Sequence, residues 1–272
     1  MSHQARNRLQ LKIADIAVAL DIADASKRAA VVERYREFLT SDGEPQATVR
    51  VEVHEGARFV PLHSGPWVIE LSEAHGRLLY RSHYDAGWIE SDSGNSFVEI
   101  APEVDIENFL RVLYAQLCLR NGGLLLHAAG VIHDGAGFVF FGPSGSGKTT
   151  VARLSLGHTV LSDDLVIVRL TGDVARVYGL PFRGDFPEAP RINQSAELRG
   201  LFQLVKAPDH RLAAVAAPEA FARLLACAPF VMIDAARARQ AMHICRQIMA
   251  RAAVRALHFR RDPGFWRVLG DD

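Results

Sequence analysis

The sequence contains few cysteines and carries no net charge. Its 272 residues include three cysteines, Cys118, Cys227 and Cys245, which lie far apart in apolar stretches. This number and spacing fit neither a disulfide framework nor a zinc knuckle, so we interpret the cysteines as buried thiols. Lys plus Arg and Asp plus Glu both number 31, so no overall field attracts nucleic acid or an anionic membrane. We therefore expect neither as a partner.

Long uncharged apolar runs are also missing. Hydrophobic residues make up 49% of the chain, yet no uncharged run reaches the length that a membrane-spanning helix needs. The first ten residues, MSHQARNRLQ, lack the apolar core of a secretory signal peptide. We expect a cytoplasmic protein with one large domain or two smaller ones. The sequence leaves assembly into a homo-oligomer open.

The first hundred residues are predicted to form a β-rich α+β region. Residues 9–22 alternate in the way a strand does, and residues 24–43 have the polar start and the glycine stop of a helix. Short alternating runs between residues 47 and 101 are separated by Gly, Ser, Asp or Pro, which predicts an antiparallel meander.

The pattern changes after Pro102. Residues 105–123 have apolar positions at helical spacing, with Asp105 as the predicted N-cap and Gly122 as the stop. We place an approximate domain boundary here, between residues 1–100 and residues 101–272. The second part mixes strand-like and helical stretches, which predicts an α/β core carrying extra antiparallel strands.

A glycine-rich stretch in the second part, GPSGSGKT, predicts a phosphate site. Gly142, Gly147, Lys148 and Thr149 occupy the fixed positions of a P-loop. Glycines allow the backbone N–H groups to point inward, Lys148 can reach the outer phosphates, and Thr149 offers a hydroxyl to Mg²⁺. The other residues expected to line the phosphate chain are Pro143, Ser144, Gly145, Ser146 and Thr150.

The surroundings of this stretch favour the P-loop over a flexible Gly/Ser turn. Two apolar runs joined by HDGAG predict a hairpin that leads into the loop, and TTVARLSLG after it is a short helical pattern. ATP with Mg²⁺ is the predicted ligand.

Candidate catalytic groups flank the loop on both sides. The segment HTVLSDD ends an apolar stub in Asp163 and Asp164, and if that stub is the next strand of the same sheet, both carboxylates face the phosphates. The alternative is a plain Ser-Asp-Asp turn. Asp234 is a competing acid, although it precedes a helical pattern and is more simply an N-cap. His127 is either a core residue or part of the site.

The segment from His127 to Asp164, HAAGVIHDGAGFVFFGPSGSGKTTVARLSLGHTVLSDD, resembles the catalytic domain of HPr kinase/phosphorylase and its shorter relatives. ELRGL, at residues 197–201, looks like that family's second signature. The resemblance implies a fold similar to the nucleotide-binding half of phosphoenolpyruvate carboxykinase. It also implies transfer of the γ-phosphate of ATP to a serine hydroxyl.

The same resemblance implies roles for single residues. Asp163 would be the base towards the serine, with His127 beside the acid pair. Asp164 and Glu197 would support the metal, together with Thr149. Lys148 would bind the phosphates, and Arg199 and Arg183 would be the cations on the transferred group.

This sequence also departs from the bifunctional enzymes, because Phe202 stands where they have a further glycine. The resemblance therefore does not extend to the reverse phosphorylase activity or to HPr as substrate, and the sequence leaves both open. Some shorter relatives phosphorylate ribosomal peptides, notably the C-terminal serine of lasso-peptide precursors. The sequence thus predicts an ATP-dependent serine kinase acting on a peptide, a small protein or a serine-like small molecule. An ATPase and a non-catalytic nucleotide sensor are the alternatives.

Overall fold

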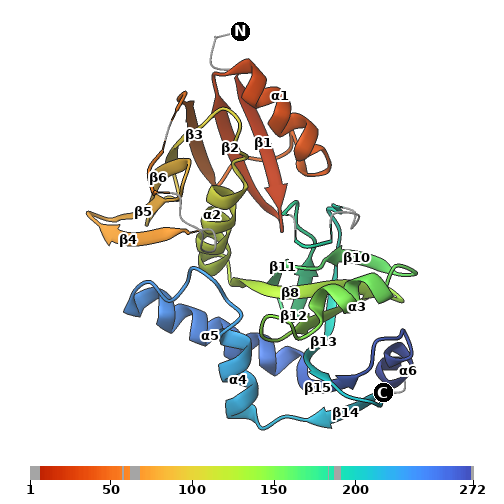
Figure 1. Ribbon diagram of the computed structural model, residues 1–272. Coiled ribbons are helices and arrows are strands. Elements are labelled where there is room, and N and C mark those ends of the chain that lie inside the picture. Colours follow the sequence, from red (N-terminus) through yellow and green to blue (C-terminus); the bar gives the residue numbers. More distant parts are fainter. Residues whose placement is uncertain (1–6, 57, 62–67, 183, 187–190, 271–272) are drawn as a thin grey trace. The chain divides into compact units, whose positions relative to one another are not determined.

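The computed structural model describes residues 7–56, 58–61, 68–182, 184–186 and 191–270 (Figure 1). The chain forms two compact units, Met1–Leu117 and Cys118–Asp272. Each unit contains one β-sheet, so the protein is a mixed α/β molecule. The division between the units lies inside helix α2 (Glu107–Arg120).

The first unit contains a seven-stranded sheet with the order β1-β2-β3-β7-β6-β5-β4. The run predicted as one strand over residues 9–22 is instead a hairpin of β1 (Arg8–Ile13) and β2 (Ile16–Ile22). Ala14 and Asp15 form its turn with φ values of 50° and 60°. A two-residue turn of this kind matches the twist of the strands it joins. It does not interrupt the sequence alternation, which is why the run reads as one strand.

The helix predicted over residues 24–43 is shorter than expected. α1 (Ala25–Arg34) begins after Asp24, whose carboxylate accepts a hydrogen bond from the Lys27 backbone N–H at 2.7 Å. A 3₁₀ turn, Arg36–Phe38, follows it. Polar and apolar residues continue past Arg34 at helical spacing, so the pattern does not reveal this end.

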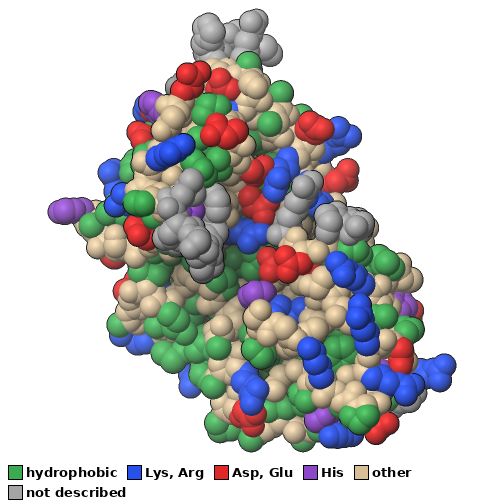
Figure 2. Space-filling view, in the orientation of Figure 1, with side chains coloured by type: hydrophobic (Ala, Val, Ile, Leu, Met, Phe, Trp, Pro, Cys, Tyr) green, Lys and Arg blue, Asp and Glu red, His purple; other side chains and the backbone are tan. Residues whose placement is uncertain are grey.

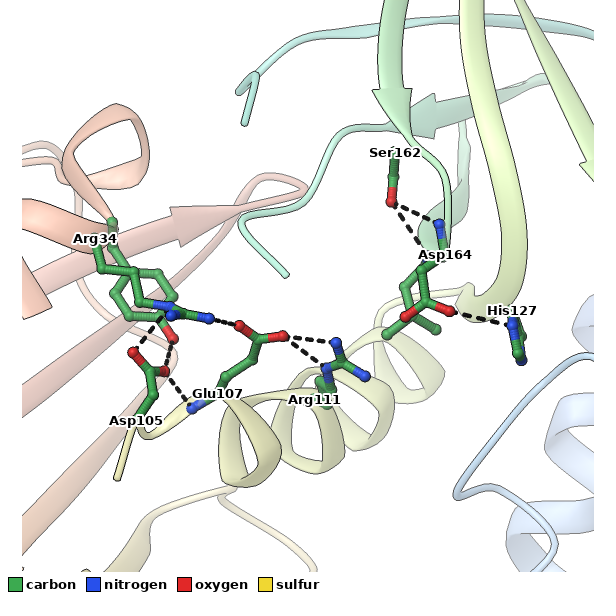
Figure 3. Close-up of polar contacts among 9 residues, drawn as sticks. Arg34, Asp105, Glu107, Arg111, His127, Ser162 and Asp164 are labelled. Atoms are coloured by element: carbon green, nitrogen blue, oxygen red, sulfur yellow. Dashed lines mark hydrogen bonds and ion pairs between the residues drawn. The ribbon is translucent and has the colours of Figure 1, made fainter. Parts of the chain in front are cut away.

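The predicted antiparallel meander is confirmed for four strands, β4 (Glu70–Ala74), β5 (Arg77–Arg81), β6 (Asp85–Glu90) and β7 (Ser96–Ile100). It is wrong for β3 (Ala47–Val53), which runs parallel to both of its neighbours, β2 and β7. The predicted helix start at Asp105 is confirmed, because its carboxylate accepts a hydrogen bond from the Glu107 backbone N–H at 2.7 Å (Figure 3).

The second unit is built around strands whose pairings close on themselves. β8 (Gly123–His133) and β9 (Ala136–Phe141) form the predicted hairpin. β8 also pairs with β11 (Leu165–Thr171), and the pairings continue through β12 (Val174–Tyr178) and β13 (Ser195–Lys206) back to β9. The further strands are β10 (Thr159–Ser162), β14 (Arg211–Ala214) and β15 (Ala253–Phe259).

Alternation along these strands separates two apolar cores. Leu124, Leu126, Val139 and Phe141 belong to one core, which includes residues of α4 (Ala217–Leu225) and α5 (Ala235–Arg251). The side chains that point to the opposite face of these strands, among them Val131 and Phe140, belong to the second core. This core includes residues of α3 (Lys148–Leu154) and α6 (Phe265–Gly270). Strand side chains point to opposite faces in turn, so helices can cover both.

The surface carries charges of both signs. Figure 2 shows acidic and basic side chains on the same face. Among the described residues, none of the helices combines the length and the apolar character that crossing a bilayer requires.

Candidate functional site

The glycine-rich loop, Gly142–Gly147, connects β9 to α3 and depends on its glycines. Gly142, Gly145 and Gly147 have φ values of 154°, 75° and 110°, which residues with a side chain rarely adopt. Space is also short, because a Cβ atom on Gly147 would lie 2.7 Å from Cζ of Phe259. The strand, loop and helix occur in the order predicted from the sequence.

Lys148 lies over this loop. Its side chain is buried, and Nζ donates hydrogen bonds to the carbonyl oxygens of Gly142 at 3.1 Å and Pro143 at 3.4 Å. Carbonyl groups carry no net charge, so these two contacts place no counter-charge on the lysine.

Asp163 and Asp164 occupy a break in a strand that runs along β8. β10 and β11 are both antiparallel to β8, with Ser162 opposite Gly130 and Leu165 opposite His127. On the other side of β8, Ala128 pairs with Phe141, the last residue before the glycine-rich loop. The acid pair therefore lies two strand spacings, or about 10 Å, from the start of the loop.

The two aspartates have different surroundings. Asp163 is buried, and burial raises the pKa of its carboxyl group. A hydrogen bond from the Thr149 side chain opposes this shift, whereas the charges of Asp164 and Asp185 add to it. Its Oδ2 atom is buried and has no hydrogen-bond partner among the described residues. A buried, unpaired carboxylate oxygen is costly unless a cation or a proton reaches it.

Asp164 is more open and pairs with His127 (Figure 3). His127 Nε2 lies 3.1 Å from Asp164 Oδ1, and half of the His127 side chain is exposed. The Asp164 backbone N–H donates a hydrogen bond to Ser162 Oγ at 3.2 Å, which fixes the bend. The interpretation of His127 as a core residue is therefore wrong, because half of its side chain is exposed and its ring pairs with Asp164.

These groups line one pocket of about 340 Å³. Loop residues, Lys148, Thr149, Thr150, both aspartates and His127 contribute to it. Two further residues, Asp185 and Lys206, complete the lining and were missed in the sequence. Lys206 is the last residue of β13, and Asp185 precedes a buried phenylalanine, so neither position has a local signature. Arg183 lies outside the described residues.

Glu197 and Arg199 lie on β13, away from the pocket that contains the acid pair. Glu197 pairs with Ala136, the first residue of β9, whereas the glycine-rich loop follows Phe141, the last. Ala136 and Phe141 are five residues apart along β9, which corresponds to roughly 16 Å. Arg199 sits where the register between β13 and β9 shifts, and it lines a different pocket together with Phe202 and Arg255. The structure does not bring Glu197 or Arg199 to the acid pair.

The remaining candidates are placed as follows. Asp234 is the N-cap of α5 and accepts hydrogen bonds from the backbone N–H groups of Ala236 and Arg237, at 2.7 and 2.9 Å, as predicted. Cys118 and Cys245 are buried, as predicted.

Cys227 is only partly buried and borders the glycine-rich loop. Burial raises the pKa of its thiol, and the Gly142 backbone N–H and the charge of Lys148 partly offset that shift.

Comparison with known proteins identifies a family. The family described as "ScmC: SynChlorMet cassette protein ScmC" matches residues 98–259, more than half of the chain, and the chain therefore belongs to the ScmC family. No curated protein matches it. A solved structure described as the Hpr(Ser) kinase/phosphatase from Coxiella burnetii is similar at 17% identity with a TM-score of 0.25. That similarity covers 34% of this chain and 77% of the other chain, so the relationship is distant.

Proposed function

We propose that this member of the ScmC family is an ATP-dependent kinase that transfers the γ-phosphate to a serine hydroxyl of a peptide, a small protein or a serine-like small molecule. One observation carries the proposal. A glycine-rich loop with a buried lysine faces an acid pair across a single pocket, and one carboxylate oxygen of that pair is buried without a partner. Phosphoryl transfer needs this combination of anion site, metal site and carboxylate base.

The loop and Lys148 are proposed to bind the phosphates as a P-loop. Backbone N–H groups of Gly145 and Gly147 would contact phosphate oxygens, and Lys148 would move from its carbonyl partners to the outer phosphates. Within the described residues, Lys206 adds a second cation to the pocket lining. Its charge would help neutralise the phosphate chain.

The donor set of the pocket fits a magnesium ion. Mg²⁺ prefers hard oxygen ligands and is held by a hydroxyl and a carboxylate beside nucleotide phosphates. Thr149 and Asp163 supply these two groups in direct contact with each other. When bound, the ion would neutralise charge on the phosphates. A cation would also remove the cost of burying the unpaired oxygen of Asp163.

Asp164 is the better candidate for the base, which reverses the division of roles implied by the family resemblance. It is more exposed than Asp163, and His127 orients its carboxylate. The serine proton would pass to Asp164 while the serine oxygen bonds to the γ-phosphorus and the bond from phosphorus to the leaving oxygen of ADP breaks. His127 acts as a positioning residue in this scheme.

The test is transfer of radiolabelled phosphate from ATP to the products of neighbouring genes, with Mg²⁺ present. Label that survives acid and is released by hot alkali supports phosphoserine. Acid-labile label rejects a serine acceptor. Release of free phosphate regardless of acceptor indicates an ATPase, and nucleotide binding without turnover indicates a sensor.

A further inference from the structure

A further pocket lies beyond the carboxyl ends of strands that border the glycine-rich loop. β9, β13 and β15 are parallel, so their carboxyl ends meet at one edge. β13 ends at Lys206, which lines the phosphate pocket, and β15 ends at Phe259, whose ring lies against Gly147. The segments after both strands therefore start at the glycine-rich loop.

These segments form an open pocket of about 530 Å³, lined mainly by Asp209, His210, Arg260, Asp262, Gly264 and Arg267. Sites for small molecules and cofactors have volumes of roughly 300–1,000 Å³. The pocket is large enough for a base and a ribose.

Asp262 holds the two walls of this pocket together. Its Oδ1 atom lies 2.8 Å from His210 Nε2 on the opposite segment, and accepts a hydrogen bond from the Gly264 backbone N–H at 2.8 Å. Arg260 pairs with the other carboxylate oxygen. The Gly264 backbone N–H, with His210 and Arg260, lowers the pKa of Asp262 to about 2. These contacts link the two walls of the pocket without a ligand.

Two side chains at the pocket remain available for a ligand. Asp209 and Arg267 are both exposed. No ion pair involves Arg267 in the part of the chain that the structure describes. A guanidinium can stack on an aromatic base, and a carboxylate can accept hydrogen bonds from ribose hydroxyls.

The direction of a bound nucleotide follows from the strand order. β9 lies between β8 and β13. The acid pair lies beyond β8, and β15 lies beyond β13, on the opposite side of β9. A γ-phosphate that faces Asp164 leaves the rest of the nucleotide to extend over β13 and β15. Two strand spacings, about 10 Å, separate β9 from β15.

We propose that the pocket between the segments after β13 and β15 binds the nucleoside part of the nucleotide, with Arg267 on the base and Asp209 on the ribose. This inference rests on the proposed function, since it requires phosphates in the glycine-rich loop. It assigns a binding role to residues that no sequence pattern indicated.

The test compares two probes, MgATP and magnesium tripolyphosphate, which share the phosphate chain but not the nucleoside. Binding of each probe to the full chain is measured by calorimetry for the wild type and for R267A and D209A. We expect each variant to weaken ATP binding about fivefold, the effect of roughly 1 kcal/mol. Tripolyphosphate binding should stay the same. R251A, an exposed arginine at the end of α5, is the matched control and should change neither.

The outcomes separate this inference from the proposed function. If the wild type binds ATP no more tightly than tripolyphosphate, or if R267A and D209A leave that ratio unchanged, the nucleoside pocket is refuted and the phosphate site stands. A variant that alters only the KM of the acceptor also refutes it. If the wild type binds neither probe, the proposed function fails, and the nucleoside pocket fails with it. Lys148→Ala should weaken both probes together.

Discussion

Asp163 and Asp164 are adjacent in the sequence, yet one is buried against Thr149 and the other faces His127 at the pocket. Asparagine at either position keeps the shape of the side chain and removes the charge. The two substitutions should have different effects, because Asp163 is the proposed metal ligand and Asp164 is the proposed base.

We expect Asp164→Asn to lower the rate of phosphate transfer by about 10²- to 10⁴-fold, the usual contribution of a general base, with ATP binding retained. Asp163→Asn should instead raise the Mg²⁺ concentration needed for half-maximal transfer, because it removes a metal ligand. Transfer rates at several Mg²⁺ concentrations distinguish the two. If Asp163→Asn lowers the transfer rate as strongly as expected for a base and leaves the Mg²⁺ dependence of the residual transfer unchanged, Asp163 is the base.

The connection between β9 and α3 depends on close approach of the backbone to Phe259. Gly147→Ala would place a methyl group against the Phe259 ring and would force φ near 110° on a residue with a Cβ atom. We expect a loss of about 2 kcal/mol of unfolding free energy, or a displaced loop and at least tenfold weaker ATP binding. Denaturant unfolding and calorimetry measure these effects.

Gly157→Ala is the matched control, since a Cβ atom there meets nothing within 4 Å. It should change stability by less than about 0.5 kcal/mol. Equal effects of both substitutions would show that the contact with Phe259 does not constrain the loop.

The turn between β4 and β5 contains a residue that suits its backbone poorly. His75 and Gly76 have φ values of 52° and 72°, a geometry for which Asn-Gly is preferred. His75 is exposed, so His75→Asn should raise the unfolding free energy by roughly 0.5 kcal/mol, whereas His75→Val should lower it by about 1 kcal/mol. Urea unfolding tests both. A more stable valine variant would contradict this turn geometry.

On the scale of the whole molecule, one buried carboxyl group should make stability depend on pH. Burial raises the pKa of Asp85 to about 6, although a hydrogen bond from Tyr80 Oη at 2.7 Å partly opposes this. The folded pKa is above the unfolded value, so the folded state binds the proton more tightly. The contribution of Asp85 to stability is therefore present below about pH 4 and is lost as the pH rises through 6.

The measurement is the difference in unfolding free energy between the wild type and Asp85→Asn at several pH values. Asparagine does not titrate. The unfolding free energy of the wild type should therefore fall, relative to that of Asp85→Asn, by up to about 3 kcal/mol between pH 4 and pH 7. Other titrating groups cancel in the comparison. A constant difference would show that burial does not raise the pKa of Asp85.

Local features of the chain were predictable from the sequence alone. The glycine-rich loop, the β8–β9 hairpin and the capping roles of Asp105 and Asp234 follow from short-range backbone preferences that neighbours in sequence determine. The same locality limits the prediction. A two-residue turn at Ala14 and Asp15 preserved the alternation of β1 and β2, so the hairpin was not visible.

Tertiary structure decided what surrounds the loop. Strand register depends on pairing between distant segments, and a shift of one residue moves every side chain to the other face. Pairing with β8 brings Asp164 to His127, and pairing of β13 with β9 places Glu197 at the opposite end from the loop while Lys206 reaches the pocket. The sequence determined the loop and a set of candidate side chains. The register of the sheet determined which of them meet, because only paired strands fix positions across distances that local preferences do not span.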